Sequence, residues 1–256
     1  MQRLLAAALV VAVLAGCSGP HPPPAPPSPS PSRQPAPSAA AAAATGFTLP
    51  VFPPAPTPVK IRVPAGVTPY LHEIPTNQRV AFLTIDDGFV KTPVAPRLIA
   101  AAHIPVTLFL TIDAIKDDPD YFRPMLQNGA TIEAHTLTHQ NLRGKPYAVQ
   151  RREICGSADE LGRLYGRRPV LFRPPFGAQD ATTLRAAHDC GMTAAFMWKE
   201  TVDKGRVRFQ VGRTVQAGDI ILMHFRPAFQ QDFEAALAAI HRAGLTPARL
   251  EDYLPG

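Results

Sequence analysis

Short hydrophobic runs alternate with amphipathic segments along the last three quarters of the chain. Runs rich in β-branched and aromatic residues predict buried strands, whereas apolar residues spaced every three or four positions predict helices that cover them. The expected strands are 80–85, 106–111, 130–133, 170–172, 193–197 and 220–223. The expected helices are 93–102, 117–128, 146–165, 180–191 and 228–243.

This alternation, without hairpin signals between the strands, predicts an α/β domain with a parallel sheet and outer helices. About seven strand–helix units would suit a barrel-like arrangement, but periodicity does not decide whether the sheet closes. The domain is expected to span residues 68–256, and about 190 residues are enough for one substantial core.

The first residues have the layout of an export signal. Arg3 precedes an unbroken apolar run, Leu4–Leu14, that is too short for a membrane span. Because Leu14-Ala15-Gly16-Cys17 resembles a bacterial lipobox, we interpret residues 1–17 as a lipoprotein signal peptide that leaves a lipid-carrying Cys17 at the N-terminus. An ordinary secretory signal with an incidental cysteine is the alternative. Acyl chains would hold the protein on the outer face of the bacterial membrane.

Residues 18–67 differ in composition from the rest of the chain. They hold more than half of the 30 prolines, mixed with alanine and serine, and Arg33 is the only charged residue before Lys60. Such a segment cannot bury enough apolar surface to fold, and its prolines favour extended geometry. At about 3.1 Å per residue it would span on the order of 100 Å. We therefore expect a disordered linker that lets the domain reach into the cell wall.

Charge and cysteine usage narrow the partners and the compartment. The formal net charge is +6, but basic and aromatic residues are not interleaved as in nucleic-acid-binding proteins, so we expect no nucleic-acid partner. Positive charge would suit retention among anionic wall polymers, but an ordinary solvated surface is the preferred interpretation. Cys155 and Cys190 are expected to form a disulfide between two helices, as is common in exported proteins. A bound metal is the competing interpretation, but zinc-ribbon spacing is missing.

Candidate chemistry begins where the strand 80–85 ends. Asp86 and Asp87 follow it directly, and Gly88 comes next. The C-terminal ends of parallel strands are where α/β folds place their sites. Adjacent carboxylates repel, so the pair requires a metal ion, a shared proton or exposure to solvent. An exposed Asp-Asp-Gly turn is the alternative to a site.

A pair of histidines follows the strand 130–133. His135 and His139 are four residues apart, which would place both imidazoles on one face of a helical turn and let them bind one ion. Two unrelated histidines are the alternative. Two imidazoles and one carboxylate form the ligand set of a catalytic zinc site, which leaves the second carboxylate free to act as general base. Cobalt, nickel or iron could bind the same ligands.

Three more candidates lie at or just after predicted strand ends. His224 could protonate a leaving group, or it could be a hydrogen-bonded histidine at the rim. Arg173 could orient a carboxylate, or it could form a structural ion pair. Pro174 and Pro175 have no N–H, so Phe176 offers the first backbone donor after Arg173, and this donor could face a developing oxyanion.

Taken together, these segments resemble the polysaccharide deacetylases of carbohydrate esterase family 4, the NodB homology domain, across nearly all of residues 78–256. The matching segments are Thr84-Ile85-Asp86-Asp87-Gly88, His135-Thr136-Leu137-Thr138-His139, Arg173-Pro174-Pro175-Phe176-Gly177 and Leu222-Met223-His224. The resemblance implies a distorted (β/α)7-type barrel. It also implies a role for each residue. Asp86 would be the general base, oriented by Arg173, and His224 the general acid. Asp87, His135 and His139 would bind a divalent metal, Zn2+ in the first place, and the N–H of Phe176 would bind the oxyanion.

The chain departs from the family at its fourth motif, an aspartate followed by an aromatic residue. Asp203 is the best candidate for the carboxylate that polarises His224, but Lys204 follows it. Trp198 would supply an apolar substrate wall from another position. In addition, Phe225 follows His224 where an aspartate is common. These changes concern substrate detail more than the metal.

The activity implied by the resemblance is hydrolysis of N-acetyl groups on peptidoglycan or a chitin-like polysaccharide. We expect a monomer, anchored only by the lipid at Cys17. Two alternatives use the same scaffold. One is an O-acetyl esterase that acts on xylan or wall sugars, and the other is a catalytically weak glycan-binding lipoprotein. An amine leaving group needs the general acid more than an alkoxide does, so substitution of His224 would separate the first two activities.

Overall fold

The computed structural model describes residues 46–64 and 66–255. The predicted signal peptide, Cys17 and the predicted linker up to residue 45 lie outside the described residues. Within the described part, no helix combines the length and the hydrophobicity that crossing a membrane would need.

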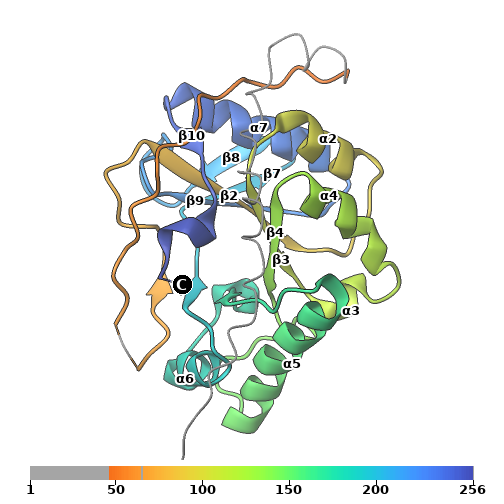
Figure 1. The fold of residues 1–256 in the computed structure, drawn as a ribbon, viewed down its shortest axis with the longest axis vertical. Coiled ribbons are helices and arrows are strands. Elements are labelled where there is room, and N and C mark those ends of the chain that lie inside the picture. Colours follow the sequence, from red (N-terminus) through yellow and green to blue (C-terminus); the bar gives the residue numbers. More distant parts are fainter. Residues whose placement is uncertain (1–45, 65, 256) are drawn as a thin grey trace, which may run out of the picture. The chain divides into compact units, whose positions relative to one another are not determined.

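A mostly parallel sheet forms the centre of the domain (Figure 1). Its strand order is β1-β6-β5-β4-β3-β2-β9-β7-β8, and β10 pairs with the start of β2. The bounds are β1 Tyr70–Leu71, β2 Val80–Asp87, β3 Val106–Leu110, β4 Ala130–Ala134, β5 Leu171–Phe172, β6 Ala194–Phe196, β7 Glu200–Asp203, β8 Arg206–Phe209, β9 Ile220–His224 and β10 Thr246–Pro247. The edge strands β1 and β8 do not pair with each other. The predicted distorted barrel is therefore confirmed as an open half-barrel.

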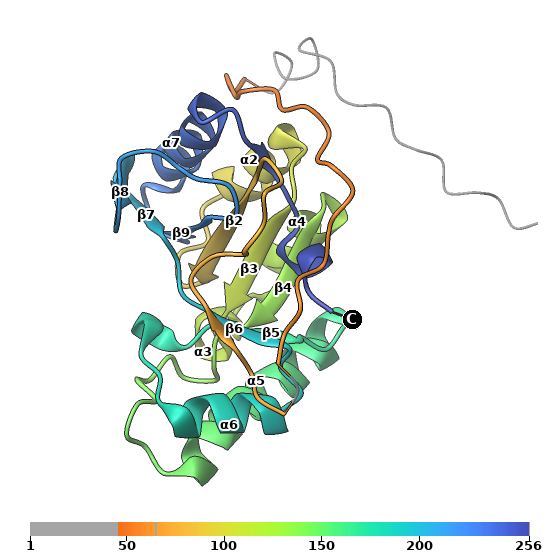
Figure 2. The same ribbon diagram turned by 90° about the vertical axis from the view of Figure 1, so that its left-hand side faces the viewer.

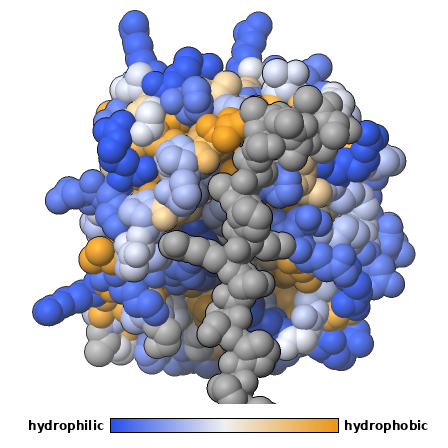
Figure 3. Space-filling view, turned by 45° about the horizontal axis from the view of Figure 1, so that its top comes forward, coloured by the Kyte–Doolittle hydropathy of each residue, from blue (hydrophilic) through white to orange (hydrophobic). Residues whose placement is uncertain are grey.

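Helices cover the outside of the sheet, as predicted. Their bounds are α2 Val94–Ala102, α3 Ile112–Ile115, α4 Arg123–Gln127, α5 Tyr147–Tyr165, α6 Ala181–Asp189 and α7 Phe229–Arg242. Figure 2 shows α7 at the end of the sheet that carries β7 and β8, with α5 and α6 at the opposite end. Where α2 and α7 come forward, hydrophilic side chains project from the surface (Figure 3), because the apolar stripes of such helices face the sheet. Some hydrophobic residues still show between them.

The prediction of a single helix at 117–128 is wrong. A 3-10 turn, Pro119–Phe122, precedes the short helix α4 instead. Pro119 and Pro124 each stand in the first turn of one of these pieces. Proline lacks an N–H and clashes with the preceding turn, so the second proline prevents one continuous helix.

The hydrophobic pattern also missed the β7–β8 hairpin, the one antiparallel pair among the described strands. Its turn residues Lys204 and Gly205 have φ values of 53° and 70°, as in a two-residue type I′ turn. The first position of this turn usually holds asparagine, aspartate or glycine. With lysine there, the sequence signal is weak.

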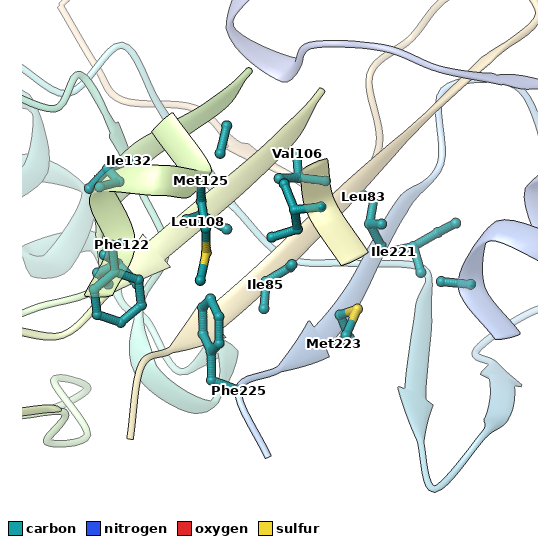
Figure 4. Packing of buried hydrophobic residues seen from close by; sticks show 14 of the residues in the cluster. Leu83, Ile85, Val106, Leu108, Phe122, Met125, Ile132, Ile221, Met223 and Phe225 are labelled. Atoms are coloured by element: carbon teal, nitrogen blue, oxygen red, sulfur yellow. The ribbon is translucent and has the colours of Figure 1, made fainter. Parts of the chain in front are cut away.

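Both faces of the sheet are buried, as a parallel sheet requires. Seven of the eight residues of β2 are buried. Leu83 and Ile85 point to the outer layer, where they lie beside Ile221 and Met223 of β9 (Figure 4). Phe82 belongs to a second cluster, in which its ring packs edge-to-face on Tyr253 with centroids 5.0 Å apart. Strand alternation places Asp86 on the same side as Phe82.

Part of the predicted linker, residues 46–64, lies against the domain. Leu49 is buried, and Phe47 and Phe52 pack against the main core. Further along, the N–H of Ile61 donates to the carbonyl of Tyr253 at 2.8 Å. Scattered apolar side chains thus hold residues 46–64 against the domain, despite the prolines that made this stretch look like linker.

Cys155 in α5 and Cys190 at the end of α6 form a disulfide. The bridge closes a loop of 35 residues, so its removal should lower the free energy of unfolding by about 3–4 kcal/mol. We expect the Cys155→Ser, Cys190→Ser double variant to melt about 10 °C below the unsubstituted chain. Thermal unfolding with and without reductant checks this. If reductant lowered the melting temperature of the double variant as much as that of the unsubstituted chain, the loss could not be assigned to the disulfide.

Burial of Glu200 predicts pH-dependent stability. Its burial in β7, and next the charge of Asp219, raise the pKa of Glu200 to about 9. The folded state therefore keeps the proton of Glu200 at pH values where the unfolded chain has released it. The stability that this proton contributes is complete below about pH 4.5 and declines as the pH rises toward 9. Each pKa unit corresponds to about 1.4 kcal/mol. Between pH 5.5 and 8.5 the melting temperature should fall, and Glu200→Gln should flatten that fall; parallel curves would contradict the assignment.

Candidate active site

Strand β2 delivers two carboxylates to the same cavity, but the two have different surroundings. Asp86 is buried and stands in register with His224 of the neighbouring strand β9. Asp87 has a φ of 78°, in the left-handed region, and its carbonyl accepts a hydrogen bond from the N–H of Thr111 at 3.1 Å. The two adjacent carboxylates can therefore do different work.

The helical turn expected around His135 and His139 is wrong. Both histidines lie in an irregular loop after β4, because Thr136 and His139 have φ values of 72° and 57°. The loop nevertheless brings the imidazole rings together, with centroids 5.0 Å apart. The two imidazoles therefore lie side by side, as the spacing predicted, but on a loop and not on a helical turn.

The side chain of Glu153 fixes this loop from α5. One of its oxygens accepts the N–H groups of Leu137 and Thr138 at 3.1 and 3.0 Å, and the other accepts from the Thr138 hydroxyl and the Gln140 amide. Glu153 is buried. A buried carboxylate with four donors holds its segment firmly, because losing those bonds would leave its charge unsatisfied.

Asp87, His135 and His139 form a compact ligand set. The Nε2 atoms of His139 and His135 lie 3.1 and 3.5 Å from Oδ1 of Asp87, and one ligand atom from each residue lies within 4.8 Å of the others. Oδ1 is buried without a well-formed hydrogen bond from the described residues. Burial alone would raise the pKa of Asp87, but the two imidazoles hold it well below its usual range. An ionised, unsatisfied oxygen between two imidazoles fits a divalent metal such as zinc.

The orientation of His135 also fits a metal ligand. Its Nδ1 lies 2.7 Å from the carbonyl oxygen of Arg173. A carbonyl can only accept, so Nδ1 carries a proton, which leaves Nε2 as the ring nitrogen that can bind an ion beside Asp87. Burial lowers the pKa of His135, but Asp86 and Asp87 raise it further, so the net shift is upward.

Arg173 holds Asp86 in place. Its Nη1 donates to Oδ1 of Asp86 at 2.6 Å and to the hydroxyl of Thr84 at 2.8 Å. The guanidinium is fully buried and stacks over the ring of Phe109, 4.3 Å from its centroid. One oxygen of Asp86 is thereby fixed, while Oδ2 remains 3.7 Å from Nε2 of His135. This arrangement suits a base that is oriented by a buried cation.

Phe176 adopts a strained backbone at the mouth of the site. Its φ of 61° is uncommon for a bulky residue, and such strain is often found at functional sites. Its ring packs on His139, with centroids 4.8 Å apart. No described residue accepts a hydrogen bond from its backbone N–H. The N–H is thus free to donate to another acceptor.

The predicted hydrogen bond between Asp203 and His224 does not form. The carboxylate of Asp203 instead faces Arg226 and Arg208, at 3.4 and 3.8 Å. Nδ1 of His224 is buried and finds no hydrogen-bond partner among the described residues, and burial lowers the pKa of His224. The reason lies in the missed hairpin, which brings Arg208 beside Asp203.

A cavity of about 410 Å³ unites these groups. Its lining residues include both aspartates of β2, both histidines of the β4 loop and His224. Phe176 and Trp198 add aromatic surface, and Asp203, Arg208 and Arg226 add charge. Arg173 lies behind the wall, in contact with Asp86.

A family model for polysaccharide deacetylases matches residues 73–195, the part that carries Asp86, Asp87, His135, His139, Arg173 and Phe176. An uncharacterised protein of Streptomyces coelicolor is 41% identical over 197 residues, which cover 73% of this chain and 77% of that protein. The chain belongs to the polysaccharide deacetylase family.

Other members of the family are more distant. The peptidoglycan-N-acetylglucosamine deacetylase of Bacillus cereus is 24% identical over 177 residues, which cover 66% of this chain and 83% of that enzyme. A CE4-family pseudoenzyme from Bacillus anthracis shares the fold, with a TM-score of 0.63 and 17% identity over 73% of this chain and 69% of that one. Because the family fold also occurs in a pseudoenzyme, activity has to be argued from the residues.

Sequence reasoning missed several residues that support the polysaccharide deacetylase site. Glu153 could have been noticed, because it stands on the buried stripe of α5 with Gln150 and Ser157, where an amphipathic helix normally places apolar residues. Thr84, which accepts from Arg173, left no comparable signal. Arg208 and Arg226 reach the site only through the hairpin and the end of β9.

Proposed function

We propose that the protein is a metal-dependent hydrolase that removes N-acetyl groups from a cell-wall glycan. One observation carries the proposal: the Asp87–His135–His139 ligand set and the arginine-held carboxylate of Asp86 lie in one cavity with His224. A vestigial site would have no need to keep a buried cation on one carboxylate and two imidazoles on its neighbour. Family membership supports the acetylated-glycan substrate.

Asp87, His135 and His139 would hold the metal. When bound, a divalent ion such as zinc polarises a carbonyl group and lowers the pKa of water. The protonated Nδ1 of His135, held by the carbonyl of Arg173, keeps the ligand nitrogen in the correct tautomer. Cobalt, nickel or iron would suit the same donors.

The chain would supply both a base and an acid from one cavity. Asp86 accepts a proton from the attacking water as the new C–O bond forms, and the hydrogen bond from Arg173 keeps its carboxylate aimed. The N–H of Phe176 donates to the carbonyl oxygen as that oxygen gains negative charge. His224 gives a proton to the sugar nitrogen as the C–N bond breaks, so that acetate and a free amine leave.

Acetate release by the purified full chain tests the proposal. Substrates are chitooligosaccharides, peptidoglycan and acetylxylan, each with and without chelator. We expect release from one of the N-acetylated substrates, loss on chelation and recovery with added metal. Metal analysis before and after chelation identifies the ion. Release from acetylxylan alone would favour the O-acetyl esterase, and full metal loading with no release from any substrate would favour a glycan-binding role.

We further propose that the protein is exported and anchored by lipid at Cys17, with the prolines that follow as a spacer. The disulfide between Cys155 and Cys190 supports export, because such bonds persist in oxidising compartments. Mass spectrometry of the N-terminal peptide from the native host should find an acylated cysteine. Cys17→Ala should release the protein from the membrane fraction. An unmodified N-terminus at another position would remove the anchor from the proposal.

A further inference from the structure

One wall of the active-site cavity is cationic. Arg208 of β8 and Arg226, two residues beyond β9, line the same cavity as the predicted metal ligands. They flank the carboxylate of Asp203 at 3.8 and 3.4 Å. These distances exceed the 2.7–2.9 Å or so of a charge-assisted hydrogen bond, and the arginine side chains remain 67% and 46% exposed. One carboxylate therefore leaves much of the donor capacity of two guanidinium groups unused.

The hairpin directs this charge into the cavity. In the β7–β8 register Thr201 stands opposite Arg208, and both line the cavity. The next pair, Val202 and Val207, points to the opposite face, toward the core. The side chain of Arg208 thus stands on the cavity face of the hairpin, and Arg226 meets it from the adjoining strand end.

We propose that Arg208 and Arg226 bind a carboxylate carried by the acetylated sugar itself, which makes the protein selective for acidic glycans. The proposal rests on the function proposed above and specifies its substrate. The planar fork of arginine matches a carboxylate with two parallel hydrogen bonds. Because both arginines share one cavity of about 410 Å³ with the metal ligands, the acid must lie within about one sugar ring of the acetyl group. A neutral chitin-like chain offers these arginines no anionic partner.

Three matched substrates test this. The first is peptide-free peptidoglycan strands, in which every second sugar carries a free lactyl carboxylate. The second is the same strands with those carboxylates converted to methylamides, and the third is strands that keep their stem peptides. For the wild-type chain we expect kcat/KM to be about tenfold or more higher on the first than on the second, as charge-assisted bonds made to only one substrate would produce.

Arg208→Gln and Arg226→Gln should bring that ratio toward one, mainly through KM. Arg213→Gln is the matched control, because Arg213 is exposed beyond the same hairpin and does not line the cavity. A wild-type ratio near one, or a preference seen only with stem peptides attached, overturns the proposal. So does a ratio that both cavity variants leave unchanged.

Binding separates this proposal from failure of the proposed hydrolysis. Trp198 is the only tryptophan in the sequence and lines the cavity, so its fluorescence reports occupancy. If no substrate releases acetate, the hydrolase proposal fails, but tighter binding of the free-carboxylate strands than of the methylamide strands still supports the arginine subsite. Equal dissociation constants overturn it.

Discussion

Asp86→Asn is expected to lower the rate of acetate release by a factor of about 10² to 10⁴. Asparagine keeps the shape of the side chain but cannot accept a proton from water. The proposed ligands Asp87, His135 and His139 are untouched, so the bound metal should remain close to one equivalent. Acetate assays and metal analysis on the same preparation check both expectations.

Asp87→Asn is the matched control, because it alters the neighbouring carboxylate. It should lose metal as well as activity, since the removed charge lies between two imidazoles. Asp86→Asn also leaves the buried charge of Arg173 without its partner, which costs about 3–5 kcal/mol in similar sites. Its folding must therefore be verified by thermal unfolding. Folded, metal-loaded Asp86→Asn with wild-type turnover would remove Asp86 from the role of base.

His224→Gln should affect amides and activated esters unequally. An amine leaves only when protonated, whereas the alkoxide of an activated ester leaves without help, so we expect a loss of about 10² or more on N-acetyl substrates and a much smaller loss on an activated acetate ester. The ratio of the two kcat/KM values, measured on one preparation, is the test. Equal losses on both substrates would show that His224 does not act as the general acid.

Asp203→Asn tests the other half of that prediction. The family pattern pairs this carboxylate with His224, but here it faces Arg208 and Arg226. We expect the amide-to-ester ratio of Asp203→Asn to stay close to that of the unsubstituted chain. A drop that parallels His224→Gln would restore Asp203 as the polarising group.

The elements that carry the proposed metal ligands could be predicted from the sequence because their signals are local. Strand β2 is a dense apolar run that ends in two acids, and β4 is a shorter run that ends in the histidine loop. Arg173 likewise follows its strand directly. For these positions, knowing that a residue ends a parallel strand is enough to place it at the shared edge of the sheet.

The remaining features depend on backbone geometry that residue types did not reveal. Thr136 and His139 take up left-handed conformations that a helical spacing rule cannot anticipate. The turn at Lys204 lacks the usual residue, so the hairpin and the neighbours of Asp203 stayed hidden. Glu153 acts across 13 to 16 positions of sequence, and only the packing of α5 against the loop shows what it holds.

Arg173 has an implication for redesign of this scaffold. Its side chain aims the proposed proton acceptor, and its main-chain carbonyl sets the ring of His135. A single residue therefore fixes the positions of both the proposed base and one proposed metal ligand. A redesign for a different metal or a different nucleophile must keep the backbone at residue 173 in place, because a shift there would move both Asp86 and His135.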